Sequence, residues 1–243
     1  MDSKFVIHPN GGGLVSTSAN VAPSAYVGEF CVVYGQSHVL DYAQIRGRAR
    51  VFDHAVVRDK AIVEDYAIVE GVAKICESAR ISGSSKIRGG YIGGNANVFQ
   101  SAVISDGTVL VIGTALVSGA ARLSDNCTVD GKATISGNAS VSGSARVVDH
   151  ARVTGFAEVT DAAEISGFAS ISGSANIAGS AVIGGRAKIS GEAIVMGFAR
   201  VFGQVVVDGQ SVLEDGVIES ENDLDDARIQ HYLQRRQETD LSG

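Results

Sequence analysis

Aliphatic side chains recur at every sixth position along most of this chain. A Val or Ile stands at each sixth place from Val21 to Ile87, and a Val, Ile or Leu does so again from Val111 to Leu213. Repetition of a short unit over most of a chain is typical of a solenoid. Roughly thirty-three units lie between residues 21 and 218, and they divide into about eleven coils of three units each.

The unit has the pattern aliphatic-x-Gly/Asp-x-Ala-x, as in the stretch VSGSAR that begins at Val141. A β-branched residue suits a short strand whose side chain points into a core. Gly, or Asp in its place, suits a sharp corner where the backbone adopts a positive φ. Ala is small enough to fit beneath that corner. The pattern therefore predicts an all-β, triangular solenoid of parallel strands with a rise of about 4.8 Å per coil.

The repeat resembles that of the hexapeptide-repeat, left-handed β-helix superfamily, the trimeric LpxA-like fold that houses many acyltransferases. The resemblance covers about 200 of the 243 residues. Here the small residue follows one place later than in the commonest enzyme repeat, as in ISGNAS from Ile135, and this style is closest to the YdcK-like branch. The resemblance implies a left-handed parallel β-helix and a homotrimer, with a dimer as the alternative.

Two irregularities interrupt the period of six. The unit from Ile87 to Tyr91 is one residue short, and the stretch from Ile104 to Leu110 is one residue long. A change of one residue reverses the direction of side chains in an extended segment. The two changes predict either tolerated bulges or a site or subunit contact between Arg88 and Ile112.

The two ends of the chain depart from the repeat. Residues 1–20 are predicted to form an N-terminal cap, residues 21–218 the β-helix, and residues 219–243 an acidic C-terminal helix and tail. The helix is expected from Ser220 to Gln237, because acids such as Glu221 stand at its start and Arg235 and Arg236 at its end, as the helix dipole favours. It is expected to cap the last coil or to pack on a neighbouring subunit.

Composition and charge exclude several classes of partner. The net charge is −7, which argues against nucleic acid, whose binding needs a concentrated basic surface. No apolar run is long enough to span a membrane and no signal peptide is recognisable, so we expect a cytoplasmic protein without a membrane partner. The three scattered cysteines fit reduced thiols in that compartment.

Histidines are the candidate catalytic residues, because the resemblance implies a histidine general base in the acyltransferases. Stacking of the coils is expected to bring His38 and His54 near one corner, together with Tyr34 and Phe52. These two histidines are the catalytic candidates if the chain is an acyltransferase, with acyl-CoA as its cofactor. The alternative is that they are surface residues at a corner without a catalytic role. The histidine spacing fits no metal site, and no other cofactor is expected.

Apolar residues at outward positions point to an interface, because contiguous exposed apolar area marks contact surfaces. The candidate interface residues are Tyr34, Phe52, Ile68, Val103 and Met196 on one face, Ile112 and Phe202 on another, and Tyr232 in the C-terminal helix. No long loop interrupts the units to cover a substrate. We therefore expect a non-catalytic, homo-oligomeric scaffold that binds a partner. An acyltransferase acting at a subunit groove is the alternative, and an inhibitory or sequestering binder is the lesser one.

Overall fold

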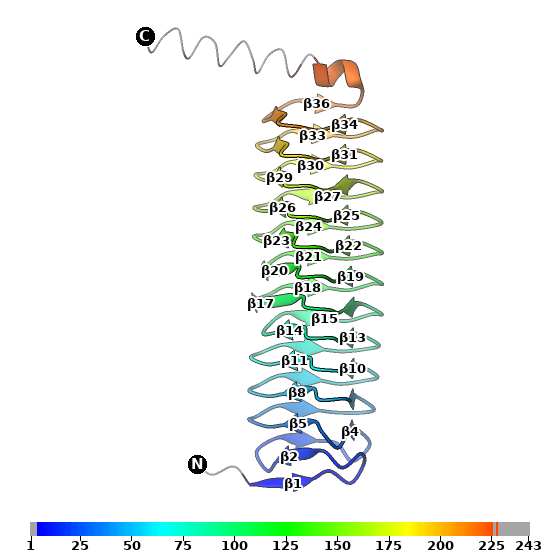
Figure 1. Ribbon diagram of the computed structural model, residues 1–243, viewed down its shortest axis with the longest axis vertical. Coiled ribbons are helices and arrows are strands. Elements are labelled where there is room, and N and C mark those ends of the chain that lie inside the picture. Colours follow the sequence, from blue (N-terminus) through cyan, green and yellow to red (C-terminus); the bar gives the residue numbers. More distant parts are fainter. Residues whose placement is uncertain (1–3, 226, 228–243) are drawn as a thin grey trace, which may run out of the picture.

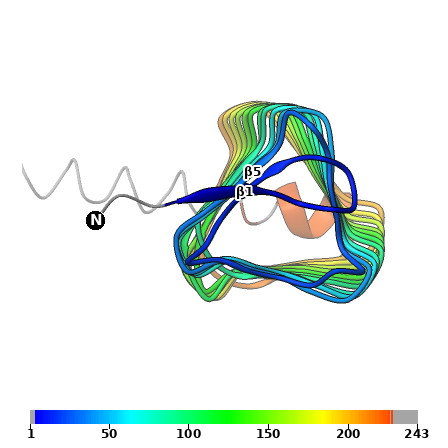
Figure 2. The same cartoon turned by 90° about the horizontal axis from the view of Figure 1, so that it is seen from below.

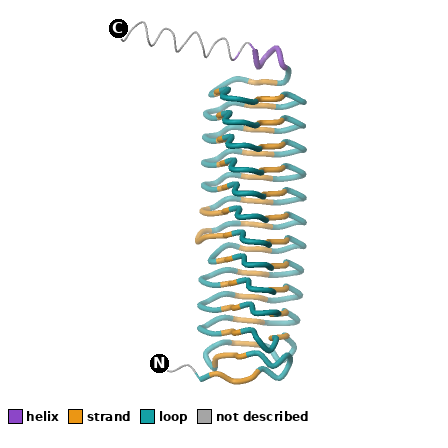
Figure 3. The backbone as a smooth tube through the Cα atoms, in the orientation of Figure 1, coloured by secondary structure: helices purple, strands orange, loops and turns teal. Residues whose placement is uncertain are grey.

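The computed structural model describes residues 4–225 and 227, which form a left-handed parallel β-helix of about eleven turns with a triangular cross-section (Figures 1 and 2). Each coil contributes a short strand to each of three sheets, and each strand pairs with the strands one coil before and one coil after it. Short strands and turns alternate along the rod (Figure 3). The fold class predicted from the repeat is therefore confirmed.

The first sheet begins with an antiparallel pair, β1 and β2, and continues as a parallel ladder. Because β2 already belongs to this ladder, the solenoid begins inside the segment 1–20 that the sequence predicts as a cap. In sheet order its strands are β1 (Phe5–Ile7), β2 (Leu14–Ser16), β5 (Val32–Val33), β8 (Arg50–Val51), β11 (Ile68–Val69), β14 (Lys86–Ile87), β17 (Val103–Gly107), β20 (Arg122–Asp125), β23 (Ser140–Val141), β26 (Glu158–Val159), β29 (Asn176–Ile177), β32 (Ile194–Val195) and β35 (Val212–Leu213).

The other two sheets form the remaining sides of the triangle. The second sheet contains β3 (Asn20–Val21), β6 (His38–Val39), β9 (Val56–Val57), β12 (Lys74–Ile75), β15 (Tyr91–Ile92), β18 (Leu110–Val111), β21 (Thr128–Val129), β24 (Arg146–Val147), β27 (Glu164–Ile165), β30 (Val182–Ile183), β33 (Arg200–Val201) and β36 (Val217–Ile218). The third contains β4 (Tyr26–Val27), β7 (Gln44–Ile45), β10 (Ile62–Val63), β13 (Arg80–Ile81), β16 (Asn97–Val98), β19 (Leu116–Val117), β22 (Thr134–Ile135), β25 (Arg152–Val153), β28 (Ser170–Ile171), β31 (Lys188–Ile189) and β34 (Val206–Val207).

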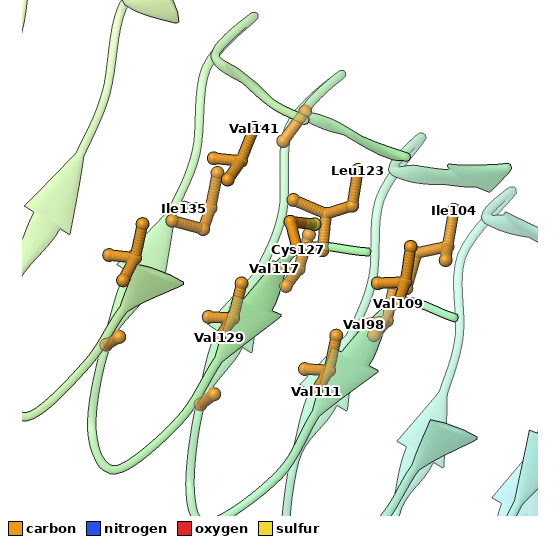
Figure 4. Close-up of a cluster of buried hydrophobic side chains, with 14 of the residues drawn as sticks. Val98, Ile104, Val109, Val111, Val117, Leu123, Cys127, Val129, Ile135 and Val141 are labelled. Carbon is orange, nitrogen blue, oxygen red and sulfur yellow. The ribbon is translucent and has the colours of Figure 1, made fainter. Parts of the chain in front are cut away.

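The core consists of the aliphatic residues that recur every sixth place. From Val27 to Val207 these side chains are fully buried, and so are the alanines at the fifth place of each unit. Figure 4 shows the stacking, with Val98, Val117 and Ile135 from successive coils of the third sheet. Each buried aliphatic contributes about 1.5–3 kcal/mol, so the stacks along the axis stabilise the rod. The predicted inward direction of these residues is confirmed.

The corners also follow the prediction. The third residue of a unit has a positive φ, whether it is Gly or Asp, as at Gly137 with φ 71° and Asp149 with φ 60°. A Cβ on Gly137 would lie 2.9 Å from the backbone nitrogen of Gly155, one coil further on. Small residues therefore recur at the corners because successive corners stack tightly.

Both changes of register fall in one column of corners, between the first and second sheets. Lys74 pairs with Tyr91, seventeen residues on, and Tyr91 pairs with Leu110, nineteen residues on. Ile87 and Ile92 on either side of the short corner are both buried, so the corner absorbs the change without reversing the strands. In the long corner β17 continues to Gly107 with a bulge against β20.

A third change of register, which the sequence pattern did not reveal, precedes the last strand. Arg200 pairs with Val217, seventeen residues on. A helix then begins at Glu221 and is described to Asp225, with Ala227 also helical. Leu224 is fully buried in the core cluster, so the first turn of this helix covers the end of the solenoid. The rest of the predicted helix, including Tyr232, lies outside the described residues.

Candidate functional site

Two aromatic rings stack on the outer side of the first sheet. Tyr34 follows β5 and Phe52 follows β8, and their ring centroids lie 4.6 Å apart with 11° between the planes. Neighbouring parallel strands are about 4.8 Å apart, so equivalent outward side chains on adjacent coils stack face to face. Both rings are partly buried, with Val32 and Ile68 in the same sheet. We call these four residues, Val32, Tyr34, Phe52 and Ile68, the N-terminal patch.

The hydroxyl of Tyr34 stays protonated at neutral pH. Partial burial raises the pKa of Tyr34, and the nearby Arg50 opposes this effect only in part. A neutral phenol is both a donor and an acceptor. The patch therefore offers flat apolar area with one polar atom at its edge, a combination that is enriched at protein interfaces.

A cluster of charges borders the N-terminal patch toward the middle of the rod. The carboxylate of Glu70 accepts a hydrogen bond from Arg88 at 2.7 Å and lies 3.1 Å from the ammonium of Lys86. Partial burial alone would raise the pKa of Glu70, but these two cations outweigh it and lower that pKa. Exposed ion pairs of this kind stabilise a fold by less than about 1 kcal/mol. The cluster therefore marks the end of the N-terminal patch and adds little to the stability of the rod.

The other predicted interface residues are spread over the rod. Val103 lies beyond the charged cluster, and Met196 lies near the C-terminal end of the first sheet. Ile112 and Phe202 lie on the second sheet, as the repeat predicts. The ring of Phe202 lies against Gly184 of the preceding coil, where a Cβ would come within 2.8 Å of Phe202 Cε1. All four side chains are partly buried.

The structure gives the two candidate histidines different surroundings. His38 lies in β6, and its Nδ1 is 3.3 Å from the side-chain amide nitrogen of Asn20. His54 is exposed in the corner between β8 and β9, and its backbone N–H donates to the carbonyl of Gly71. Within the described residues, no hydrogen bond or ring contact joins the two imidazoles. A catalytic role for either histidine stays a prediction.

A shallow depression lies on the third sheet near the N-terminal end of the rod. It has a volume of about 820 Å³. Beside it the guanidinium of Arg48 lies between two rings, 5.9 Å from the centroid of Phe30 and 6.0 Å from that of Tyr66. The side chains that line the depression are Asn10, Ser24, Tyr26, Glu29, Phe30, Tyr42, Gln44 and Arg46.

A second depression, a notch of about 410 Å³, coincides with the two changes of register. The short corner at Gly90 is recessed, and Val72 and Thr108 project from the corners of the coils on either side. The hydroxyl of Tyr91 donates to Glu77 at 2.8 Å, and this bond with burial raises the pKa of Tyr91 to about 12. Lys74 and Leu110 complete the notch. The concavity lies in the region 88–112 for which the sequence left a site as one alternative.

Neither a metal centre nor a membrane span is found in the part of the chain that the structure describes. No group of three or more His, Cys, Asp or Glu side chains there is arranged to hold a metal ion. None of the described helical residues belongs to a helix long and apolar enough to cross a membrane. The three cysteines are buried and unpaired.

Comparison with known proteins does not identify a family for this chain. No family model matches the chain, and no curated protein matches it. Among solved structures it is similar to a UDP-N-acetylglucosamine acyltransferase from Campylobacter jejuni, with 16% identity and a TM-score of 0.25. The similarity covers 67% of this chain and spans 66% of the length of that one. The assignment as a hexapeptide-repeat β-helix accordingly rests on the coils themselves.

Proposed function

We propose that this chain is a non-catalytic scaffold, a rigid homo-oligomeric β-helical rod that binds a protein partner. The observation that carries the proposal is the stacked pair of Tyr34 and Phe52 on the flat outer side of the first sheet. Aromatic side chains held in place by their neighbours lose little conformational entropy when a partner covers them. A flat, preorganised apolar surface is therefore suited to contact with another protein surface.

The regularity of the coils supports the same function. Paired strands of the parallel ladders are seventeen to nineteen residues apart from β2 to β36, so no described coil has room for an inserted loop. Pockets that hold small substrates bury most of the ligand between walls. The depression near the N-terminal end and the notch at the changes of register are both open to solvent, which favours a surface contact over an enclosed substrate.

We infer that the oligomer is a homotrimer in which the N-terminal patch lies between subunits. Parallel rods in a closed ring would place equivalent faces of the first sheet at each contact. The charged cluster around Glu70 borders the contact and keeps its apolar part at the N-terminal end of the rod.

Light scattering coupled to gel filtration tests the proposal. The wild-type protein should elute as a multiple of three 25.0 kDa chains, 75 kDa for one trimer or 150 kDa where two trimers pair end to end. Phe52→Glu buries a charge in the lateral contact and should reduce the mass of the assembly to one third of the wild-type value. Ser144→Glu, at an exposed corner elsewhere, is the matched control and should leave the mass unchanged. A wild-type protein that is monomeric at high concentration would overturn the homo-oligomer.

Among the described residues, no contact specifically supports the acyltransferase or the inhibitory binder, the two alternative functions. The acyltransferase would need a histidine held in place by a hydrogen-bond acceptor, as a general base requires. His54 is exposed, and the described partner of His38 is the Asn20 amide. The inhibitory or sequestering binder differs from the scaffold only in the partner. Binding of an acyl-CoA would therefore be the result that favours an enzyme.

A further inference from the structure

Among the described strands, the first has a partner at only one of its two edges. β1 is the terminal strand of the first sheet, and among the described strands it pairs only with β2. Its three residues are all apolar and well exposed: Phe5 at 47%, Val6 at 52% and Ile7 at 71%. An exposed, apolar edge without Pro or charge is a template for pairing with another strand.

Hydrogen bonds next to β1 show which backbone groups face that free edge. The carbonyl of Lys4 accepts from the N–H of Thr17, and the N–H of His8 donates to the carbonyl of Gly13, both at 2.9 Å. In an antiparallel strand, alternate residues direct their backbone groups to opposite edges. Residues 4, 6 and 8 therefore face β2, and the N–H and C=O groups of Phe5 and Ile7 face outward.

We infer that the free edge of β1 pairs with β1 of a second copy of this chain, in an antiparallel arrangement with Val6 opposite Val6. That register places Phe5 opposite Ile7 on both sides of the two-fold axis. Phe5 and Ile7 then exchange both backbone hydrogen bonds in each half, so all four outward groups of each strand are satisfied. The side chains that meet across the pair are apolar, and no like charges oppose each other within the strand.

The exposed apolar side chains of the rod concentrate at this end. Among the residues that the structure describes, six of the fifteen large apolar residues with exposed side chains lie within the first thirty positions. They are Phe5, Val6, Ile7, Leu14, Tyr26 and Phe30. Clustering of this kind marks a contact surface, and the end of the rod therefore offers more contact area than the strand alone.

The opposite end of the rod is closed. At the start of the helix the backbone N–H of Ser220 donates to the carboxylate of Asp223 and the backbone N–H of Asp223 donates to the hydroxyl of Ser220, and Leu224 is buried against the core. Glu221 also accepts a hydrogen bond from the N–H of Val206 in the last strand of the third sheet. One open and one closed end produce a head-to-head pair of rods rather than a filament, because a two-fold contact uses each open end once.

A single cysteine placed at the two-fold axis tests the pairing. Val6 opposite Val6 is a non-hydrogen-bonded pair with Cα atoms about 4.5 Å apart, which lies within the range of a disulfide. Cys31, Cys76 and Cys127 are all buried, so the background is low. Under mild oxidation Val6→Cys should give a covalent dimer of about twice 25.0 kDa, while Ser144→Cys at an exposed corner should not.

A second variant removes the outward hydrogen bond without touching the contact to β2. Ile7→Pro deletes an N–H that faces the free edge, and Pro is tolerated on an edge strand in that position. Added to Val6→Cys, it should suppress the cross-linked dimer by at least about tenfold, while the melting temperature stays close to that of the wild type. Phe52→Glu, which acts on the lateral contact, should leave the cross-link unchanged.

The inference is independent of the lateral trimer and fails separately. Cross-linking of Val6→Cys that is no faster than that of Ser144→Cys would overturn it, including the case in which a strand of another protein occupies the edge. Cross-linking that survives Ile7→Pro would also overturn the strand pairing, because the contact would then not use the backbone of β1.

Discussion

The carboxylate of Asp149 accepts a hydrogen bond from the backbone N–H of Gly167, the corner residue one coil further on, at 3.0 Å. At these corners the fourth residue of the unit makes the coil-to-coil backbone bond, as His150 does to the carbonyl of Gly167. The N–H of the third residue has no place in that ladder. An Asp at the corner below supplies its acceptor. The same bond recurs from Asp41, Asp53, Asp59, Asp65, Asp125 and Asp161.

This relationship predicts unequal effects of two substitutions at Asp149. The residue has φ 60°, where a side chain costs roughly 1–2 kcal/mol relative to Gly. Asp149→Ala keeps that strain and loses the hydrogen bond, so it should destabilise the rod by about 1–2 kcal/mol. Asp149→Gly loses the bond but also the strain, so its effect should be under about 1 kcal/mol. Thermal melts of both variants measure the difference, and equal losses would contradict the explanation.

The sequence predicts the core and the corners because both depend on local steric rules. The aliphatic residue of each unit lies in a short strand and points inward, and the Gly or Asp lies at a corner with positive φ. These positions have the same conformation in every coil, so the structure of one unit predicts that of the others. The repeat also places Tyr34 next to Phe52 on the adjacent coil, since their positions differ by one coil. The repeat likewise places His38 of β6 beside the corner that holds His54, since His38 pairs with Val56, two residues after His54.

The repeat does not predict every surface feature. The shape of a corner that has lost or gained a residue depends on how the backbone adjusts to the new length. The sequence shows one residue too few before Tyr91, but only the structure shows a recessed corner between two projecting ones. The stacking of Arg48 between Phe30 and Tyr66 was readable from the spacing of one coil at the fourth place of the unit. The free edge of β1 was not, because the segment before Leu14 lies outside the repeat.

The recessed corner gives a prediction about Gly90. Its φ is 80°, and a Cβ there would lie 2.5 Å from the carbonyl oxygen of Val109. Gly209 has φ 64° but nothing within 4 Å of the position of a Cβ. Gly209→Ala should therefore cost only the backbone strain, roughly 1–2 kcal/mol, and Gly90→Ala should cost clearly more because the backbone of the next coil must move. Thermal melts of the two variants measure their losses of stability. Similar losses would contradict the prediction, because they would show that the backbone around the notch moves with no cost in free energy.

The scaffold proposal predicts no response to acyl carriers. A ligand of the native state present at a hundred times its dissociation constant stabilises a protein by about 2.7 kcal/mol. Coenzyme A and a medium-chain acyl-CoA at millimolar concentration should leave the melting temperature of the wild type unchanged. An increase of several degrees that disappears in His54→Ala or His38→Ala would instead favour the acyltransferase and would identify the histidine involved.

The cap at the C-terminal end predicts a pH dependence. Hydrogen bonds from Ser220, first its side chain, together with the N–H groups of Glu219 and Ser220, lower the pKa of Asp223. A carboxyl whose folded pKa is lowered stabilises the fold above its unfolded pKa, and this contribution disappears as the pH falls through the folded pKa. The cap should therefore be intact at neutral pH and weakened in strong acid.

Hydrogen exchange of the last strands measures this effect. At pH 7 Asp223→Asn should speed exchange at the N–H of Val206, which bonds to Glu221 of the helix, relative to the wild type. At a pH below the lowered pKa of Asp223 in the folded protein, the wild type and the variant should exchange alike, because both then lack the charge. Ser144→Ala at an exposed corner serves as the control at both pH values. A difference that persists in acid would show that the cap depends on the shape of the Asp223 side chain rather than on its charge.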